Sequence, residues 1–191
     1  YGPLWLVWYM GDAMGNLVKV TEPNPAGGAD LNTNYSYNAA NKLSQVSMTR
    51  GSTTQTRTFS YNTYQQLQSV THPESGTTSY TYNGDGTPNT RIDTNNQKVQ
   101  YVYDSYKRVS QIKRYDVSTG SENVCQRVNF YYDTDPYNTG FLQNGWGRLT
   151  AVEYFASPSN TCTTSDQSNG IRFIERYSYT VGGLITNKRL Y

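Results

Sequence analysis

Charge, basic clusters and long apolar runs are all scarce in this sequence. Charged side chains make up 16% of the 191 residues, the formal net charge is +2, and no run of Lys or Arg exceeds two residues. A nucleic-acid-binding surface needs a concentration of basic residues, so no nucleic acid partner is expected. The longest apolar run, residues 4–10, is far shorter than the roughly 20 residues of a transmembrane helix. It also lacks the basic start and cleavage site of a signal peptide.

The residues that carry most catalytic and metal chemistry are nearly absent. His72, which precedes Pro73, is the only histidine, and Cys125 and Cys162 are the only cysteines. A zinc site needs more such ligands, and no nucleophile, phosphate-loop or dinucleotide motif is present. We therefore expect no enzyme, no metal and no cofactor, and interpret His72 as a surface turn residue. The first residue is Tyr1 rather than Met, so we expect a processed product or a piece of a longer protein.

The two cysteines leave two alternatives open. A disulfide between Cys125 and Cys162 is preferred slightly to two free thiols. Cys162 lies in a Ser-, Thr- and Asn-rich segment that is typical of an exposed loop, where a free thiol is vulnerable in an oxidising compartment.

Tyrosine and uncharged polar residues are abundant where charged residues are scarce. The chain has 19 Tyr and 16 Gly, and its mean hydropathy is −0.76. Such a polar chain can be disordered, but disordered segments are poor in aromatic residues and rich in charge. Tyr and Thr at alternating positions suit a pleated, half-buried surface. The composition therefore predicts an ordered all-β protein.

A repeat sets the positions of the tyrosines. Copies that begin at Tyr37, Tyr61 and Tyr103 share Tyr-Asn or Tyr-Asp, an apolar residue six positions after the Tyr, and another three positions further on. Weaker copies occur before, between and after them. The repeat positions are Asp12, Leu17, Tyr37, Asn38, Leu43, Tyr61, Asn62, Leu67, Tyr82, Asn83, Tyr103, Asp104, Val109, Tyr132, Asp133, Leu149, Tyr179 and Leu184.

Each repeat has the pattern of a β-hairpin. An alternating strand such as residues 77–82 leads into a turn that begins at Asn or Asp, and an apolar strand returns. A lone hairpin is marginal, so neighbouring hairpins must pair into one antiparallel sheet. We predict a single domain over residues 1–191, with about seven repeats and insertions near 133–147 and 156–170.

The motif Tyr-[Asp/Asn]-x-x-[Gly/Asn]-[Asn/Lys/Arg]-[Leu/Val]-x-x-[Val/Ile] resembles the YD repeat of the RHS family, over about residues 9–191. The resemblance implies an all-β array of antiparallel β-hairpin repeats that form a continuous spiralling sheet. In that family such sheets build a hollow shell around a toxin, or the extracellular barrel of teneurins. It further implies an extracellular or cell-surface location, with partners that are YD repeats of the same or neighbouring chains and a toxin cargo.

Two segments invite a catalytic or metal-binding interpretation. Residues 133–140 contain Asp135-Pro136 and a later Gly140, and so resemble the self-cleavage motif of RHS proteins. The glycine is displaced and no second carboxylate is identified, so a turn is the preferred interpretation. Residues 83–86 resemble part of a calcium loop but lack the other oxygen ligands, so a Gly-rich turn is preferred there too.

The leading hypothesis is a non-catalytic structural scaffold that encloses or presents cargo. One alternative is a tube or filament subunit that assembles through open strand edges, since unpaired edges invite another copy. The other is a cell-surface carbohydrate-binding module, because exposed aromatic rings stack on sugars. Trp5, Trp8 and Trp146 are its candidate platform, and Trp146 is the best candidate since the repeat explains it least.

Overall fold

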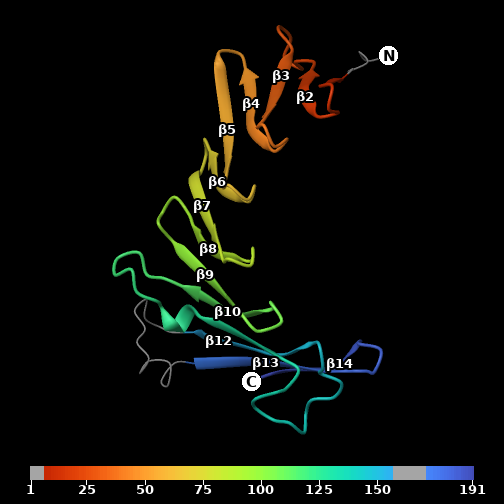
Figure 1. Ribbon diagram of the computed structural model, residues 1–191, viewed down its shortest axis with the longest axis vertical. Coiled ribbons are helices and arrows are strands. Elements are labelled where there is room, and N and C mark those ends of the chain that lie inside the picture. The colour runs from red at the N-terminus through yellow and green to blue at the C-terminus, as the bar shows by residue number, and fades with distance from the viewer. Residues whose placement is uncertain (1–6, 157–170) are drawn as a thin grey trace. The chain divides into compact units, whose positions relative to one another are not determined.

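The computed structural model describes residues 7–156 and 171–191. Within them lie fourteen strands and one short 3₁₀ helix (Figure 1). The strands follow one another in chain order in an antiparallel sheet, so each strand pairs with its neighbours in sequence. The predicted all-β array of antiparallel hairpins is confirmed.

The elements have the following bounds. They are β1 (Trp8–Gly11), β2 (Leu17–Glu22), β3 (Leu31–Tyr37), β4 (Leu43–Arg50), β5 (Thr53–Tyr61), β6 (Leu67–His72), β7 (Gly76–Tyr82), β8 (Pro88–Ile92), β9 (Lys98–Tyr103), β10 (Val109–Arg114), η1 (Val124–Gln126), β11 (Val128–Tyr132), β12 (Leu149–Ala156), β13 (Ile171–Tyr179) and β14 (Ile185–Leu190).

The contacts of the chain fall into two compact units. The first ends at Tyr80 and the second begins at Thr81, so the division falls near the end of β7. The sequence predicted one array over residues 1–191. Both consist of hairpins with the same kind of turn.

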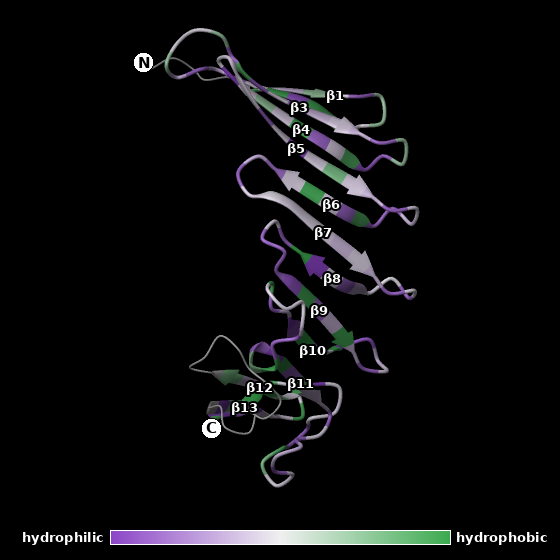
Figure 2. Ribbon diagram, turned by 90° about the vertical axis from the view of Figure 1, so that its left-hand side faces the viewer, coloured by the Kyte–Doolittle hydropathy of each residue, from purple (hydrophilic) through white to green (hydrophobic). Residues whose placement is uncertain are grey.

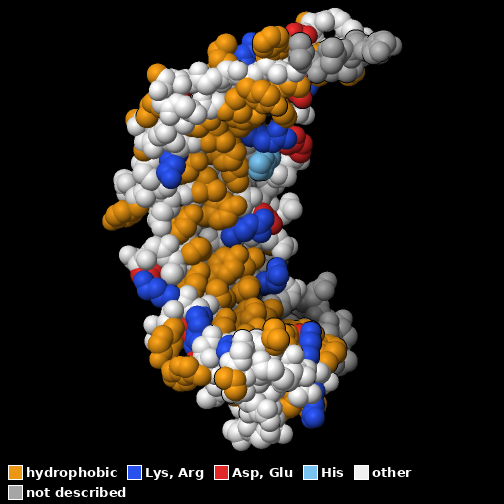
Figure 3. Space-filling view, turned by 90° about the vertical axis from the view of Figure 1, so that its right-hand side faces the viewer, with side chains coloured by type: hydrophobic (Ala, Val, Ile, Leu, Met, Phe, Trp, Pro, Cys, Tyr) orange, Lys and Arg blue, Asp and Glu red, His pale blue; other side chains and the backbone are white. Residues whose placement is uncertain are grey.

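In the first unit, one face of the sheet carries the aromatic and aliphatic residues. Tyr61 pairs with Leu67, and Phe59 pairs with Val70, so these four side chains share a face. Val70 is buried, and the others are half-buried. The strands carry short hydrophobic bands rather than continuous ones (Figure 2), and hydrophobic side chains of neighbouring strands gather on the face shown in Figure 3. This alternation is what a sheet with one apolar face requires.

The opposite face of the first unit is lined with hydroxyl and amide groups. Paired side chains on neighbouring strands hydrogen-bond across it: Thr71 Oγ1 lies 2.8 Å from Thr77 Oγ1, and Ser60 Oγ lies 2.7 Å from Ser69 Oγ. Thr21 Oγ1 donates to Asn32 Oδ1 over 2.9 Å in the same way. Each cross-strand pair of this kind contributes about 0.2–1 kcal/mol.

The second unit has a more deeply buried centre, around β11, β12 and β13. Ala151 and Ile174 are buried there together with the polar Thr150 and Ser178. Thr150 Oγ1 donates to the carbonyl oxygen of Tyr131 over 3.0 Å. Buried polar groups are stable only when they find such partners.

Candidate functional site

The turn that follows each repeat tyrosine has a defined hydrogen-bond pattern. In the turn between β3 and β4, Asn38 Oδ1 accepts hydrogen bonds from the backbone N–H groups of Ala40 and Lys42, at 3.0 and 2.9 Å. The Asn38 N–H donates to the Lys42 carbonyl, and the Asn41 N–H donates to the Asn38 carbonyl. Asn38 therefore organises the whole turn with one side chain, as Asn and Asp do in Asx turns.

The same four hydrogen bonds recur in other turns. The residues that open these turns are Asp12, Asn38, Asn62, Asp93 and Asp104. The fourth residue of each turn has a positive φ, from 59° at Gln65 to 84° at Gly15. Glycine and asparagine adopt this left-handed region most easily, which explains the Gly or Asn at this position of the motif. The Asp93 turn lies between β8 and β9 and was not predicted.

A bulge next to the turns at Asp12, Asn38, Asn62 and Asp104 explains the spacing of the apolar residues. Tyr37 pairs with Leu43, but Ser36 pairs with Gln45, so Ser44 is an extra residue on β4. Residues three apart in a regular strand face opposite sides. The extra residue returns Val46 to the face of Leu43, because Val46 pairs with Tyr35. Equivalent register shifts occur in the hairpins whose first strand ends at Gly11, Tyr61, Tyr103, Tyr132 or Tyr179.

The repeat tyrosine links its hairpin to the preceding one. The hydroxyl of Tyr37 donates to the carbonyl of Leu17 over 2.9 Å, and that of Tyr61 donates to the carbonyl of Leu43 over 2.8 Å. Tyr132 makes the same bond to Val109, at 3.0 Å, and Tyr179 makes it to Leu149. Each acceptor is the first residue of the return strand of the preceding hairpin. The two main repeat positions are therefore bonded to each other across hairpins.

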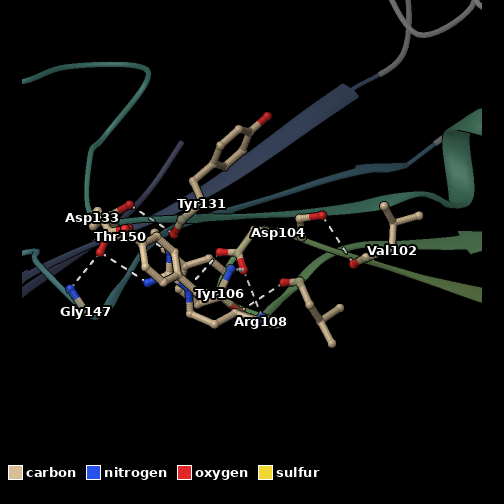
Figure 4. Close-up of polar contacts among 11 residues, drawn as sticks. Val102, Asp104, Tyr106, Arg108, Tyr131, Asp133, Gly147 and Thr150 are labelled. Carbon is tan, nitrogen blue, oxygen red and sulfur yellow. Dashed lines mark hydrogen bonds and ion pairs between the residues drawn. The ribbon is translucent and has the colours of Figure 1, made fainter. Parts of the chain in front are cut away.

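Side chains also connect neighbouring turns, most strongly at Arg108 (Figure 4). Arg108 Nε donates to Asp104 Oδ2 over 2.7 Å, within its own turn. Its two terminal nitrogens donate to both oxygens of Asp133, at 3.1 and 2.7 Å, across to the next hairpin. The guanidinium also lies over the ring of Tyr132, 4.3 Å from its centroid. A bidentate pair of this kind holds both groups in one geometry.

The carboxylates of this cluster are held in the ionised form. The hydrogen bond from Arg108, followed by that from the Gly147 N–H, lowers the pKa of Asp133. Burial would raise the pKa of Asp104, but hydrogen bonds from the backbone and side chain of Arg108 outweigh it and lower the pKa. In the turn between β7 and β8, bonds from the side chain and backbone of Thr87 lower the pKa of Asp85 to about 2.

The segment that resembles a self-cleavage motif forms a buried structural ion pair. Asp135 Oδ2 accepts a hydrogen bond from Arg176 Nε over 2.7 Å, and the two side chains are 0% and 4% exposed. Arg176 also donates to the Asn138 carbonyl over 2.9 Å, and its guanidinium lies over the ring of Phe141. The Tyr137 N–H donates to Asp135 Oδ1. Asp135 thus anchors the long turn between β11 and β12 to β13.

A second buried polar cluster lies on β11 and β12. Glu153 Oε2 accepts hydrogen bonds from Asn129 Nδ2 and from the Tyr131 hydroxyl, at 2.8 and 3.0 Å. The ring of Tyr137 packs edge-on against Tyr131, with centroids 5.5 Å apart. Burial, and then the neighbouring Tyr131, strongly raises the pKa of Tyr137. Both phenols are therefore neutral near pH 7.

The remaining repeat positions occupy the places that the register gives them, with one correction. Leu149 pairs with Tyr132, across the insertion that follows Asp133. Tyr179, however, pairs with Ile185. Leu184 instead lies in the turn, where its N–H donates to Thr180 Oγ1 and its side chain is exposed. The sequence places Leu184 five residues after Tyr179, and the equivalent position is the sixth.

The turn at Asn83 has two of the recurring backbone bonds. Its N–H donates to the Thr87 carbonyl over 2.8 Å, and the Gly86 N–H donates to the Asn83 carbonyl over 3.0 Å. Residues 83–86 thus form the Gly-containing turn that was preferred over a calcium loop. His72 is the last residue of β6, opposite Gly76.

The cysteines and tryptophans lie in different parts of the chain. Cys125 is buried in η1 and is disulfide-bonded. Cys162, its predicted partner, lies outside the described residues, as do Trp5 and residues 157–170 of the insertion predicted near 156–170. Trp8 is exposed on β1 in the first unit, and Trp146 is 77% exposed in the second. Trp146 is the third residue before Leu149, near the end of the 133–148 turn.

No group of three or more His, Cys, Asp or Glu side chains in the described part of the chain is placed to hold a metal ion. Among residues 7–156 and 171–191, no helix has the length and apolar character needed to span a membrane.

Comparison with known proteins gives one family match. A family model described as the teneurin YD-shell matches residues 7–178. No curated protein matches the chain.

Solved structures with the same fold come from toxin complexes. A chain of the Tc holotoxin pore from Photorhabdus luminescens is 18% identical with a TM-score of 0.64, and the match covers 96% of this chain and 9% of that one. The crystal structure of TcdB2-TccC3 matches at 16% identity and a TM-score of 0.53, covering 95% of this chain and 11% of that one. The chain thus spans about a tenth of the length of these toxin chains. At these identities the likeness shows the fold.

Proposed function

Because the chain belongs to the teneurin YD-shell family, we propose that it is a segment of the wall of a protein shell and performs no catalysis of its own. The observation that carries this proposal is the tyrosine link between successive hairpins. It occurs at Tyr37, Tyr61, Tyr132 and Tyr179, and each of these tyrosines bonds its hairpin to the preceding one. A hydrogen bond that repeats along the chain stabilises an extended sheet. It does not gather reactive side chains at one point.

The ion pairs of the described residues support a structural role. Asp135 and Arg176 are buried against each other, and Arg108 is shared by Asp104 and Asp133. An active site typically holds titratable groups whose pKa values are poised for proton transfer near neutral pH. The carboxyl pKa values that shift in this chain are lowered, away from neutrality.

We propose further that the wall encloses a polypeptide cargo and functions outside the cytoplasm. The toxin complexes that share the fold motivate the first part, and the disulfide-bonded Cys125 motivates the second, because disulfides persist in oxidising compartments. The hydroxyl and amide face of β2–β7 is uncharged over most of its pairs. Such a surface is suited to lie against a polypeptide without binding one sequence selectively.

Electron cryomicroscopy of the intact protein that carries this segment tests the proposal. The expected result is that residues 7–178 form part of a closed wall around density for a second polypeptide segment. A segment that lies on an open surface, with no enclosed polypeptide, contradicts cargo enclosure and leaves only the scaffold role.

Exposed terminal strands favour a second candidate, a tube or filament built from copies of this chain. Every residue of β1 and of β14 is exposed, and open edges recruit further strands. One feature counts against it: β1 has Gly11 where the other hairpins have the tyrosine, since Gly11 pairs with Leu17 as Tyr37 pairs with Leu43. A joint between β14 and the β1 of another copy would therefore lack the tyrosine link.

Size-exclusion chromatography with light scattering, followed by negative-stain microscopy over a range of concentrations, decides between the two. A monomer at all concentrations is expected for the wall segment. Elongated particles whose length grows with concentration are expected for the filament.

A further inference from the structure

The loop between β10 and β11 borders a cavity that a wall segment does not require. The loop is drawn in green beyond β10 in Figure 1. The cavity has a volume of about 430 Å³, and its polar and aromatic lining residues are Gln97, Tyr115, Asp116, Ser118, Asn123 and Gln126. All of them belong to the second unit. The volume falls within the range of about 300–1,000 Å³ of small-molecule sites.

Backbone hydrogen bonds fix the walls of this cavity. The Tyr115 N–H donates to the Lys98 carbonyl over 3.0 Å, which places the loop beside the start of β9. The Asp116 N–H donates to the Ser121 carbonyl and the Asn123 N–H donates to the Arg114 carbonyl, both over 2.8 Å. On the other wall, Asp93 closes the turn that holds Gln97. A site whose walls are already fixed loses little conformational entropy when a ligand binds.

The lining residues carry little charge. Asp116 is the only charged residue among them. Its Oδ1 accepts hydrogen bonds from the N–H groups of Ser118 and Thr119, at 2.8 and 3.2 Å. Bonds from the Ser118 side chain and then its backbone lower the pKa of Asp116, so the carboxyl group is ionised at neutral pH. An anionic ligand would be repelled by this carboxylate.

Apolar ligands and metal ions fit the lining equally poorly. Val117 is its only aliphatic residue, and an apolar ligand needs a mainly apolar wall. A metal ion needs several carboxylate or imidazole ligands at one point, and the described residues hold no such group of three.

The lining residues suit a ligand that is rich in hydroxyl groups. The side chains of Gln97 and Gln126 each have a carbonyl oxygen that accepts and an amide that donates. Asp116 Oδ1 accepts from Ser118 and Thr119 within the loop, and Oδ2 is the second acceptor of that carboxylate. Tyr115 adds an aromatic ring, with Lys98 Nζ 4.2 Å from its centroid. Apolar ring contact combined with paired donors and acceptors matches the two kinds of surface of a sugar ring.

We propose that this cavity binds a neutral saccharide of one or two sugar units. Asp116, Gln97 and Gln126 hydrogen-bond its hydroxyl groups, and Tyr115 contacts its ring. The site is independent of the shell proposal, because all its walls lie within residues 97–126.

Nuclear magnetic resonance titration of the isotope-labelled chain tests the site. The probes are free glucose, galactose, mannose and N-acetylglucosamine, with glucuronate as the charged comparison. At least one neutral sugar is expected to give saturable shifts confined to the amides of residue 97 and residues 115–126. The absence of saturable shifts with every neutral sugar, or a response to glucuronate alone, overturns the proposal.

Matched variants separate binding in the cavity from binding elsewhere. Asp116→Asn keeps a side-chain oxygen for the turn but removes the charge, and is expected to weaken binding by about tenfold or more. Gln126→Ala is expected to weaken it severalfold. Asp12→Asn makes the same change in an exposed Asx turn of the first unit and is expected to leave the affinity unchanged. Equal affinity in Asp116→Asn and wild type contradicts the site.

Discussion

The tyrosine hydroxyl is the most informative single group of the repeat. Tyr61 is half-buried at the end of β5, and its hydroxyl donates to the Leu43 carbonyl over 2.8 Å. Phenylalanine preserves the ring contacts but loses this bond. A hydroxyl in this position therefore contributes to stability beyond the packing of the aromatic ring.

Tyr61→Phe is expected to lower the free energy of unfolding by about 0.5–1.5 kcal/mol, the net value of a typical hydrogen bond. Tyr64→Phe is the control, because Tyr64 is 84% exposed at a turn tip. Loss of its hydroxyl should leave the free energy of unfolding unchanged. Urea denaturation of both variants measures the difference. Equal stabilities would show that the cross-hairpin bond contributes nothing in water.

The Asp135–Arg176 ion pair is the single contact whose loss should lower the stability of the second unit most. Both side chains are buried, and removal of one partner leaves an unpaired buried charge, which costs about 3–5 kcal/mol. Arg176→Leu is expected to destabilise the second unit by this amount, as followed by thermal denaturation. The double variant Asp135→Leu with Arg176→Leu should recover part of the loss, because no unpaired charge remains. A double variant less stable than the single one contradicts this account.

At the scale of the element, the sequence predicted the turns better than the strands beside them. Asn38, Asn62 and Asp104 open turns as expected, since the Asx side chain organises its turn locally. The bulge at Ser44 was missed, although the three-residue spacing of Leu43 and Val46 was its signal. That spacing is incompatible with a regular strand. The fold class and family were likewise predictable, because both follow from the repeat.

The remaining features depend on contacts that no local pattern encodes. The pairing of Asp135 with Arg176 joins residues 41 positions apart, and the acceptor of each tyrosine hydroxyl lies on a different hairpin. The cavity beside Tyr115 arises where a loop lies against the start of β9. Leu184 was assigned in place of Ile185 because the last turn contains two glycines and offers two apolar residues in succession.

The fourth position of the turn offers a direct test of backbone strain. Gly15 has a φ of 84°, and an added Cβ there would meet nothing within 4 Å. Gly15→Ala is therefore expected to cost roughly 1–2 kcal/mol through the backbone alone. Gln65 has a φ of 59° at the equivalent position, and Gln65→Gly is expected to change stability by less than about 1 kcal/mol, in the stabilising direction. Calorimetry of the two variants measures the direction of each change in stability. A Gln65→Gly variant less stable than wild type contradicts the strain argument.

At the scale of the whole molecule, the lowered pKa values of the turn carboxylates predict that the free energy of unfolding depends on pH. The pKa values of Asp12, Asp85, Asp104, Asp116 and Asp133 are all lowered by hydrogen bonds. A group whose pKa is lower in the folded state stabilises the fold above its unfolded pKa, and that contribution is lost as pH falls through the folded value. For Asp85 the window runs from 3.8 down to about 2.

The free energy of unfolding is thus expected to be constant near neutral pH and to fall below about pH 4. Urea denaturation at a series of pH values measures it. Asp12→Asn retains a turn-forming side chain without the charge, and should show a shallower fall than wild type. A flat profile between pH 4 and pH 2 contradicts the role assigned to these carboxylates.

The order of the strands has a consequence for how the chain acquires its structure. Every strand within residues 7–156 and 171–191 is hydrogen-bonded to strands adjacent in the sequence, so these pairings need no distant segment to be synthesised first. Loop-closure entropy is smallest for such local contacts, so topologies of this kind fold quickly for β-proteins. Hairpins can therefore form one after another as the polypeptide emerges from a ribosome or an export channel. Tyr37, Tyr61, Tyr132 and Tyr179 then each bond to the hairpin already in place.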